Sequence, residues 1–223
     1  MLKNLNIHIE LSEDLYLKNP ESSDLGKRIV CQGIDMINTI GFESFTFKKL
    51  GEKLNSNEST IYRYFKNKHL FLLYLTNWYW TWVEYKIVFA TTNISSSTKK
   101  LKNAIDILTD VINESSEMFF LNEVALYKLI SNEGNKSFHT INVNKENQKG
   151  YFDVYKNVVN RISHIICEIQ PRYKYSHMLV STVIEGVFQQ RFFAENLPSL
   201  TDQLKKQDSI SLFYNELVLK AIK

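Results

Sequence analysis

The segment at residues 46–68, TFKKLGEKLNSNESTIYRYFKNK, constrains the fold of this chain more than any other. Its pattern is that of two short helices joined by a tight turn. Apolar residues recur at i, i+3 and i+7 of the first helix, at Phe47, Leu50 and Leu54. Thr46 stands where a side-chain oxygen can cap that helix. The polar triplet Asn-Ser-Asn at 55–57 then breaks it and leaves Asn57 to cap the next helix.

The second helix of the pair begins near Glu58 and has two unlike faces. Ile61 and Phe65, four residues apart, point back toward the first helix. The opposite face carries polar, basic and aromatic side chains: Ser59, Tyr62, Arg63 and Lys66. Such a helix fits the major groove of DNA, with the preceding helix lying across the backbone. A solvated helical hairpin is the alternative interpretation.

Basic charge is concentrated in the same segment. The chain has a net charge of +3, whereas residues 46–68 carry six basic and two acidic side chains, a charge of +4 that leaves −1 for the rest. This concentration indicates a polyanionic partner. We therefore expect double-stranded DNA to be contacted by Thr46, Lys48, Asn57, Ser59, Thr60, Tyr62, Arg63, Tyr64, Lys66 and Lys68.

The expected contacts differ in kind. The guanidinium of Arg63 lies where it can read guanine, and Lys68, just past the helix, is placed to contact phosphate. The hydroxyls of Tyr62 and Tyr64 are expected to bond phosphates. A half-buried core position is the alternative for Tyr64, which lies three residues after Ile61.

The run from Thr60 to Leu70, TIYRYFKNKHL, resembles the signature T-L-Y-x-Y-F-x-s-K-e-x-L of the TetR/AcrR family of bacterial transcriptional regulators. The similarity extends upstream through Ile29, Gly33, Ile37, Gly41-Phe42 and Thr46. The turn at 55–57 departs from the usual Gly-Val-Ser, and Gly33 and Gly51 stand where the family usually has Ala. The resemblance implies a DNA-binding regulator, most often a repressor, that binds a palindromic operator as a homodimer and responds to a small molecule.

Composition and the resemblance together predict an all-α fold with an amino-terminal three-helix helix-turn-helix domain and a larger helical regulatory and dimerisation domain. Seven Gly, three Pro and 44% hydrophobic residues among 223 favour helix. We expect an amino-terminal arm at 1–22, the DNA-binding domain at 23–69, and the ligand-binding and dimerisation domain at 70–223. Two scattered cysteines and the lack of a secretory pattern favour the cytoplasm.

The most apolar segment, at residues 70–90, is expected to be a buried helix. Its charge-free part would span only ~21 Å as a helix, against a bilayer hydrocarbon core of roughly 30 Å. Aromatic residues suggest that it lines a pocket for an apolar or amphipathic effector, although an aromatic core explains them equally well. The candidate pocket residues are Trp78, Trp82, Tyr85, Phe119, Tyr127, Phe152, Tyr155 and Phe188.

Five further helices are expected, at about 99–113, 122–130, 146–169, 176–194 and 208–222, with a polar loop at 131–147. The helix at 176–194 is apolar nearly all round and needs more than one partner. Its Glu185-Gly186-Val187 resembles the family's dimer-interface pattern, so we expect a four-helix dimer interface formed with the last helix. The candidate interface residues are Leu179, Val183, Gly186, Val187, Phe213 and Leu217. A helix pair buried within a monomer is the alternative.

Two other classes of function stay open. The chain could be a helical protein-interaction module that keeps a DNA-binding scaffold without operator specificity. It could also be an enzyme, but no catalytic motif is recognisable, and no catalytic residue, cofactor or metal site is expected. His164 has no partner at helical spacing for a metal site and is expected to be a core or surface residue.

Overall fold

The computed structural model describes residues 11–110, 117–118, 120–205 and 207–223. The chain divides into two compact units. Unit 1 comprises Met1–Trp82 and Glu117–Phe152, and unit 2 comprises Val83–Ser116 and Asp153–Lys223. Unit 1 thus contains the expected DNA-binding domain together with later segments of the chain. The functional division near residue 69 therefore stays a prediction, because compactness alone does not mark it.

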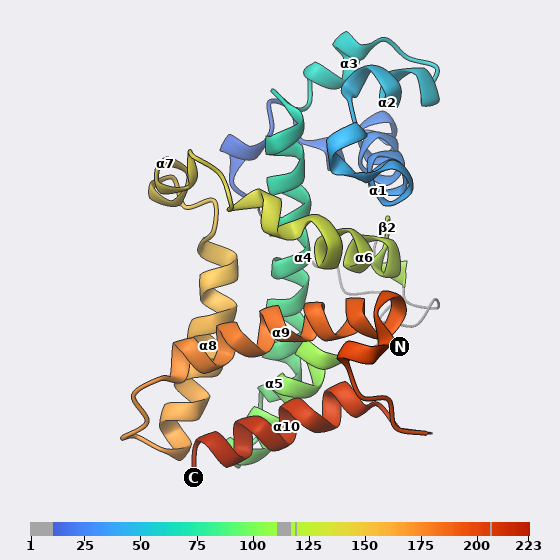
Figure 1. The fold of residues 1–223 in the computed structure, drawn as a ribbon. Helices are drawn as coiled ribbons and strands as arrows, with labels where there is room; N and C mark the ends of the chain where they lie inside the picture. The colour runs from blue at the N-terminus through green and yellow to red at the C-terminus, as the bar shows by residue number, and fades with distance from the viewer. Residues whose placement is uncertain (1–10, 111–116, 119, 206) are drawn as a thin grey trace. The chain divides into compact units, whose positions relative to one another are not determined.

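The fold is all-α, as predicted, and within the described residues the only strands are the short antiparallel pair β1 (Glu117–Met118) and β2 (Leu121–Asn122) (Figure 1). The remaining elements of unit 1 are the 3₁₀ turns η1 (Glu13–Leu15), η2 (Pro20–Ser22) and η3 (Gly134–Ser137), and the helices α1 (Asp24–Ser44), α2 (Phe47–Lys53), α3 (Glu58–Tyr62), α6 (Glu123–Glu133) and α7 (Val143–Gln148). Helix α4 (Lys68–Thr91) begins in unit 1 and ends in unit 2.

Helix α1 begins directly after Ser23 and continues past Gly41 to Ser44. The Ser23 hydroxyl accepts a hydrogen bond from the Gly26 amide at 3.2 Å and caps the helix. Gly41 has a φ of 76°, in the left-handed region that glycine adopts without steric cost, and it interrupts the helix before a last turn to Ser44. Gly33 permits close packing of the Phe71 ring, since a Cβ atom there would lie 2.5 Å from the ring.

Aromatic rings form the centre of unit 1 and fix α1–α3 on the first part of α4. The Phe71 ring lies 5.7 Å from that of Phe45 and 4.9 Å from that of Phe65, and all three side chains are fully buried. Helix α6 packs on the other part of α1, where the Asn38 amide donates to the Ala125 carbonyl at 2.8 Å. The helix-turn-helix segment therefore rests on a rigid, apolar base.

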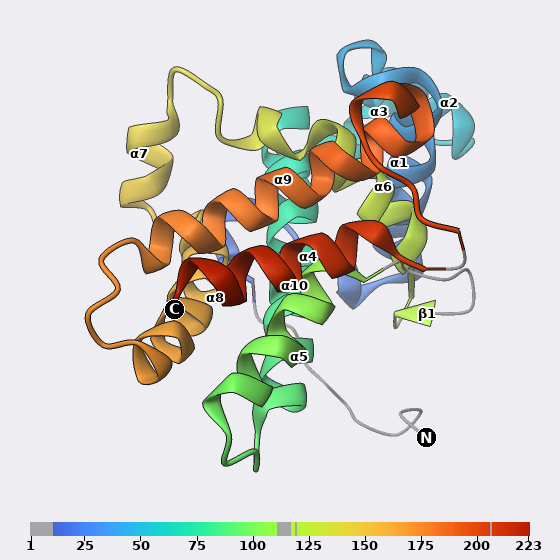
Figure 2. The ribbon, with the colours of Figure 1, turned by 60° about the horizontal axis from the view of Figure 1, so that its bottom comes forward.

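Unit 2 contains α5 (Ser97–Thr109), α8 (Asp153–Ile169), α9 (Ser176–Asn196), the 3₁₀ turn η4 (Pro198–Leu200) and α10 (Ser209–Ala221). Helix α9 packs on α8 and α10, and α5 packs on α8, α9 and α10. Figure 2 shows α9 and α10 side by side. Asp208 caps α10, because its carboxylate accepts from the amides of Ile210 and Ser211.

The helix expected at 146–169 was predicted to start too early in the chain. Gly150, with a φ of 78°, separates the short α7 from α8, which begins only at Asp153. The segment at 131–147, expected to be a loop, contains the end of α6, η3 and most of α7. These helical turns were not predicted, because they are polar and too short to show helical periodicity. The last residues of the helix expected at 99–113, residues 111–113, lie outside the described residues.

No helix in the part of the chain that the structure describes combines the length and the apolar character needed to cross a bilayer.

Candidate functional sites: a DNA-reading surface and a polar cleft

The turn between α2 and α3 is held tightly by backbone contacts. The Thr46 hydroxyl accepts from the Lys49 amide at 3.2 Å and caps α2, as predicted. The Ser56 amide donates to the Gly51 carbonyl at 2.9 Å, and a Cβ atom on Gly51 would lie 2.9 Å from the Ser56 carbonyl oxygen. Asn55 has a φ of 51°, a conformation that asparagine tolerates better than most residues. The Asn-Ser-Asn sequence therefore still makes the close turn.

Helix α3 is shorter than its sequence suggests. It ends at Tyr62, and the amides of Tyr64 and Phe65 both donate to the Ile61 carbonyl in a final tight turn. Asn57 stands at the N-cap position, but within the described part of the chain its side chain makes no capping hydrogen bond. Asn57 therefore has the predicted N-cap position but does not form the side-chain cap, and the packing of Ile61 against the core holds this helix in place.

Most of the predicted DNA-contacting side chains lie on the exposed surface of α2, the turn and α3. Ile61 and Phe65 are fully buried, as expected, so the opposite face of α3 is turned to solvent. The exposed candidates are Thr46, Lys48, Asn57, Ser59, Tyr62, Arg63 and Lys66, and Thr60 is half-buried. The Tyr62 ring packs edge-on against Phe47 at 5.1 Å, which fixes one aromatic group beside the polar ones. This surface is called the α3 face below.

Tyr64 does not belong to the α3 face. Its side chain is only 3% exposed, and its hydroxyl lies 2.8 Å from the Ser23 hydroxyl. Its carbonyl accepts from the Leu17 amide at 2.7 Å. The structure therefore contradicts the expected phosphate contact and agrees with the alternative, a core position that ties α3 to the start of α1.

Lys68 also has a different position from the expected one. Its ammonium group donates to the carbonyls of Phe42, Glu43 and Phe45, at 3.0, 3.1 and 3.4 Å. An ammonium group has three N–H donors, so these bonds leave none for a phosphate. The ammonium also lies 4.8 Å from the centre of the Phe42 ring. In this structure Lys68 holds the junction between α1 and α2, and a phosphate contact would require it to leave that junction.

The same junction is held from α6 by Glu133, which the sequence did not single out. Its carboxylate accepts from the Phe42 amide at 2.9 Å and pairs with Lys136 at 2.8 Å. Lys136 also pairs with Glu43 at 3.0 Å. The hydrogen bond from Lys136 lowers the pKa of Glu43, and the bond to Glu133 raises the pKa of Lys136. No local pattern indicates these contacts, because they join segments about ninety residues apart.

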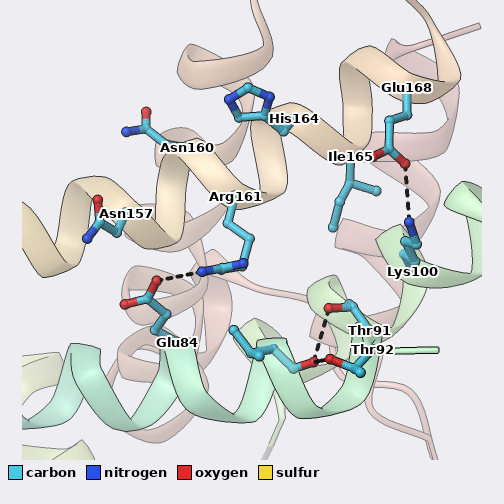
Figure 3. A pocket seen from close by; sticks show the side chains of 11 residues that line it. Glu84, Thr91, Thr92, Lys100, Asn157, Asn160, Arg161, His164, Ile165 and Glu168 are labelled. Atoms are coloured by element: carbon cyan, nitrogen blue, oxygen red, sulfur yellow. Dashed lines mark hydrogen bonds and ion pairs between the residues drawn. The ribbon is translucent and has the colours of Figure 1, made fainter. Parts of the chain in front are cut away.

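A polar cleft of about 570 Å³ lies within unit 2, between the carboxy-terminal part of α4, the start of α5, and α8 (Figure 3). Helix α8 lines it with residues at i, i+3, i+4, i+7, i+8 and i+11, which are polar except for Ile165 at i+8. The lining residues are Glu84, Val88, Thr91, Thr92, Lys100, Asn157, Asn160, Arg161, His164, Ile165 and Glu168. The exposed position of His164 on this rim agrees with the surface alternative given for it.

Two ion pairs cross the cleft. Arg161 on α8 pairs with Glu84 on α4 at 3.0 Å, and Lys100 on α5 pairs with Glu168 on α8 at 3.5 Å (Figure 3). The Ser97 hydroxyl donates to Glu168 at 2.6 Å and, with Lys100, lowers the pKa of that carboxyl. The cleft is therefore rich in charged donors and was not anticipated from the sequence.

The candidate aromatic pocket residues are divided between the two units. Trp78, Trp82, Tyr127 and Phe152 belong to unit 1, Tyr85, Tyr155 and Phe188 belong to unit 2, and Phe119 lies outside the described residues. The indole of Trp82 donates to Glu123 at 2.8 Å, and the Tyr155 hydroxyl donates to Glu185 at 3.1 Å. Burial and the neighbouring Glu185 raise the pKa of Tyr155. A shared pocket for these residues stays a prediction.

The candidate dimer residues have three different environments. Val183 and Val187 are buried inside the subunit, which contradicts their assignment to an interface. Gly186 allows α10 of the same chain to approach, since a Cβ atom there would lie 2.2 Å from the Tyr214 hydroxyl oxygen. Leu179 and Leu217 are half-buried, and Phe213 is 55% exposed.

Other large apolar side chains of unit 2 remain exposed. They are Met178, Phe192, Leu197, Leu200, Leu204 and Leu212, on α9, α10 and the segment that joins them. Together with Phe213 they are called the α9–α10 apolar surface below. Helical periodicity alone did not separate the outward residues of α9 from the inward ones, because both kinds are apolar.

The geometry of α1–α3 defines a helix-turn-helix DNA-binding domain at the amino-terminal end of an all-α chain. Residues 29–75 match the family of bacterial regulatory proteins called the tetR family. This domain therefore belongs to the TetR family. No match to the sequence was found among curated proteins.

Solved structures share the fold over most of the chain. The structure titled AibR in complex with isovaleryl coenzyme A and operator DNA has a TM-score of 0.58 at 9% identity, covering 86% of this chain and 96% of that one. The superantigen PfiT has a TM-score of 0.58 at 12% identity, with 91% and 97% covered. The fatty acid degradation regulator FadR from Bacillus halodurans has a TM-score of 0.54 at 13% identity, with 87% and 93% covered. At such identities the likeness concerns the fold alone.

Proposed function

We propose that this protein is a homodimeric transcriptional repressor that binds a palindromic operator through the α3 face and releases it when an effector binds. The observation that carries the proposal is the exposed, basic and polar α3 face on a rigid aromatic base. Arg63 and Lys66 provide cations for guanine and phosphate, and Ser59 provides a hydroxyl for base edges. The AibR complex, with its operator DNA, supports this use of the fold.

The α9–α10 apolar surface supports a homodimer. Its members are 38–66% exposed, and groups of exposed apolar side chains commonly mark protein–protein interaction sites. A second copy of the chain can cover this surface by symmetric packing of α9 and α10. A dimer also places two α3 faces on successive turns of DNA, which explains why the operator should be palindromic.

Helix α4 provides the route from effector to DNA. It starts six residues after α3 ends and continues into unit 2, so a change at its far end can alter the position of the α3 face. Coupling of this kind is reciprocal. An effector that weakens operator binding by some factor must itself bind the operator complex more weakly by the same factor. The effector expected from the aromatic residues is an apolar or amphipathic small molecule.

A protein-interaction module is the second candidate function. The superantigen PfiT shares the fold, so the fold alone does not establish operator specificity. Repeated selection from random duplexes by gel shift separates the two functions. We expect enrichment of a palindrome whose half-sites are spaced for a dimer. Binding without any enriched sequence would favour the interaction module and contradict the repressor.

A further inference from the structure

We propose that the polar cleft of unit 2 binds a small organic anion, a carboxylate or a phosphate ester, on the guanidinium of Arg161, and that this anion acts as an effector. The effector role rests on the proposed function. Binding of the anion concerns the protein alone. The anion also differs from the apolar ligand that the aromatic residues suggest, because the cleft is lined by charged and amide groups.

The size of the cleft suits a small metabolite. Its volume of about 570 Å³ lies within the range of roughly 300–1,000 Å³ of small-molecule sites. Its lining includes Val88 and Ile165, which can contact a short carbon skeleton. Polar groups surround these two side chains, so the ligand must be hydrophilic over most of its surface.

Arg161 lines the cleft and has unused hydrogen-bonding capacity. Among the described residues, only its Nη2 is hydrogen-bonded, to Glu84, although a guanidinium carries five N–H donors. Its side chain is 42% exposed, so a ligand can reach it. The planar fork of arginine matches carboxylate and phosphate oxygens with two parallel bonds, which a single bond to Glu84 does not satisfy.

Lys100 provides a second cation for the same anion. Its distance of 3.5 Å from Glu168 is long for a charge-assisted hydrogen bond, and Ser97 already donates to the same carboxylate oxygen at 2.6 Å. Lys100 can therefore turn toward a ligand without leaving Glu168 unpaired. The amide of Asn157, one helical turn before Arg161, adds a neutral donor on the same stripe of α8.

The two carboxylates of the cleft disfavour a cationic ligand as occupant. Glu84 accepts from Arg161, and Glu168 accepts from Ser97 and Lys100, so both acids are already compensated. The donors of Arg161 and Lys100 exceed the acceptors that they meet. The charges of Glu84, Lys100, Arg161 and Glu168 sum to zero, so the proposed preference for an anion rests on the free donors of Arg161.

An anion on the free donors of Arg161 would repel the neighbouring Glu84 carboxylate and so weaken its pair with the same guanidinium. The Glu84–Arg161 pair connects α4 to α8 within unit 2, as Figure 3 shows. Its loss would free the end of α4 that lies farthest from the α3 face along the chain. Loss of this ion pair is the structural change that we propose for the effector response.

The binding half is tested by calorimetric titration of the full chain without DNA. The probes are succinate for a carboxylate, inorganic phosphate for a phosphate group, and succinamide as the uncharged match of succinate. We expect at least one anion to bind at least about tenfold more tightly than succinamide, and Arg161→Gln to lose that difference. Arg172→Gln, an exposed arginine after α8, is the matched control and should bind like the parent.

Glu84→Gln gives the sharper test. It removes the competing charge but leaves Arg161 in place, so it should tighten anion binding severalfold. Circular dichroism of each variant checks that the fold is retained. Anion binding that is equal in the parent and Arg161→Gln, no preference for either anion over succinamide, or weaker binding to Glu84→Gln would each overturn the site.

The effector half is tested with the operator obtained by selection. The bound anion should lower operator affinity in the parent and leave it unchanged in Arg161→Gln. If the anion binds through Arg161 but operator affinity does not change, the site is supported and the effector role is overturned. If a palindrome is selected but neither anion binds, this inference fails while the proposed function stands.

Discussion

The carboxylate of Glu133, on α6, accepts a hydrogen bond from the backbone amide of Phe42, which follows the left-handed Gly41 near the end of α1. Lys68, at the start of α4, donates to the Phe42 carbonyl on the other side of the same residue. The junction that leads from α1 into the helix-turn-helix is thus held by two side chains from two other helices. Neither side chain belongs to the α3 face itself.

Glu133→Ala should destabilise unit 1 because it leaves the buried Phe42 amide without its acceptor. The expected cost is about 1–3 kcal/mol in the free energy of unfolding, measured by urea denaturation. Glu133→Gln should cost less, since its amide oxygen can still accept. Glu43→Ala is the control, because Glu43 pairs with the same lysine but is 76% exposed, and it should change stability by less than about 0.5 kcal/mol. Equal losses in the two alanine variants would contradict the role of Glu133.

Lys68 and Lys66 should affect DNA binding in different ways. Lys66→Ala removes an exposed cation and should lower the salt dependence of DNA binding by about one unit per subunit. Lys68→Met should leave that slope nearly unchanged and should instead lower the midpoint of thermal unfolding, because three carbonyls lose their donor. Anisotropy titrations at several salt concentrations measure the slope. A full unit lost in Lys68→Met would show that its ammonium contacts phosphate after all.

Gly186→Ala should reduce the stability of the subunit itself. The added methyl group would meet the Tyr214 hydroxyl of α10, so α9 and α10 must separate. Overpacking of this kind costs typically about 1–3 kcal/mol. Combining Gly186→Ala with Tyr214→Phe, which removes the clashing oxygen, should recover part of the loss in thermal unfolding. No recovery would mean that Gly186 has another role.

Dimerisation should depend on the exposed residues of the α9–α10 apolar surface. Met178→Glu and Phe213→Glu each place a charge where a second copy would remove water, so both should shift the protein toward monomer in sedimentation velocity. Phe89→Glu, on an exposed position of α4, is the matched control and should stay dimeric. A parent chain that is monomeric at micromolar concentration would rule out the proposed homodimer.

Sequence patterns predicted the elements of this fold better than the environment of its polar groups. Apolar spacing located α1, α2 and α10, which bury a face whose period is visible in the chain, and continuous apolar segments located α4 and α9. It missed the break at Gly150 and the early end of α3, where a single residue or a short turn decides the boundary.

The candidate sites were predictable only in part. The exposure of Arg63 followed from its position opposite Ile61, and was correct. The position of Lys68 was not predictable, and the core position of Tyr64 was given only as an alternative, because their partners Phe42 and Ser23 are far away in sequence. A lysine near a reader helix has the same local pattern whether it contacts phosphate or backbone carbonyls. The ion pair between Arg161 and Glu84 was not predictable either, because the two residues are far apart in sequence.

The most direct test of DNA reading by the α3 face compares the parent with Arg63→Ala on two duplexes. One duplex carries the selected palindrome and the other a shuffled sequence, and binding is measured by anisotropy at fixed salt. We predict that Arg63→Ala costs about 1–3 kcal/mol on the palindrome and much less on the shuffled duplex. The same loss on both duplexes would contradict base reading by Arg63 and, with it, the central claim for the α3 face.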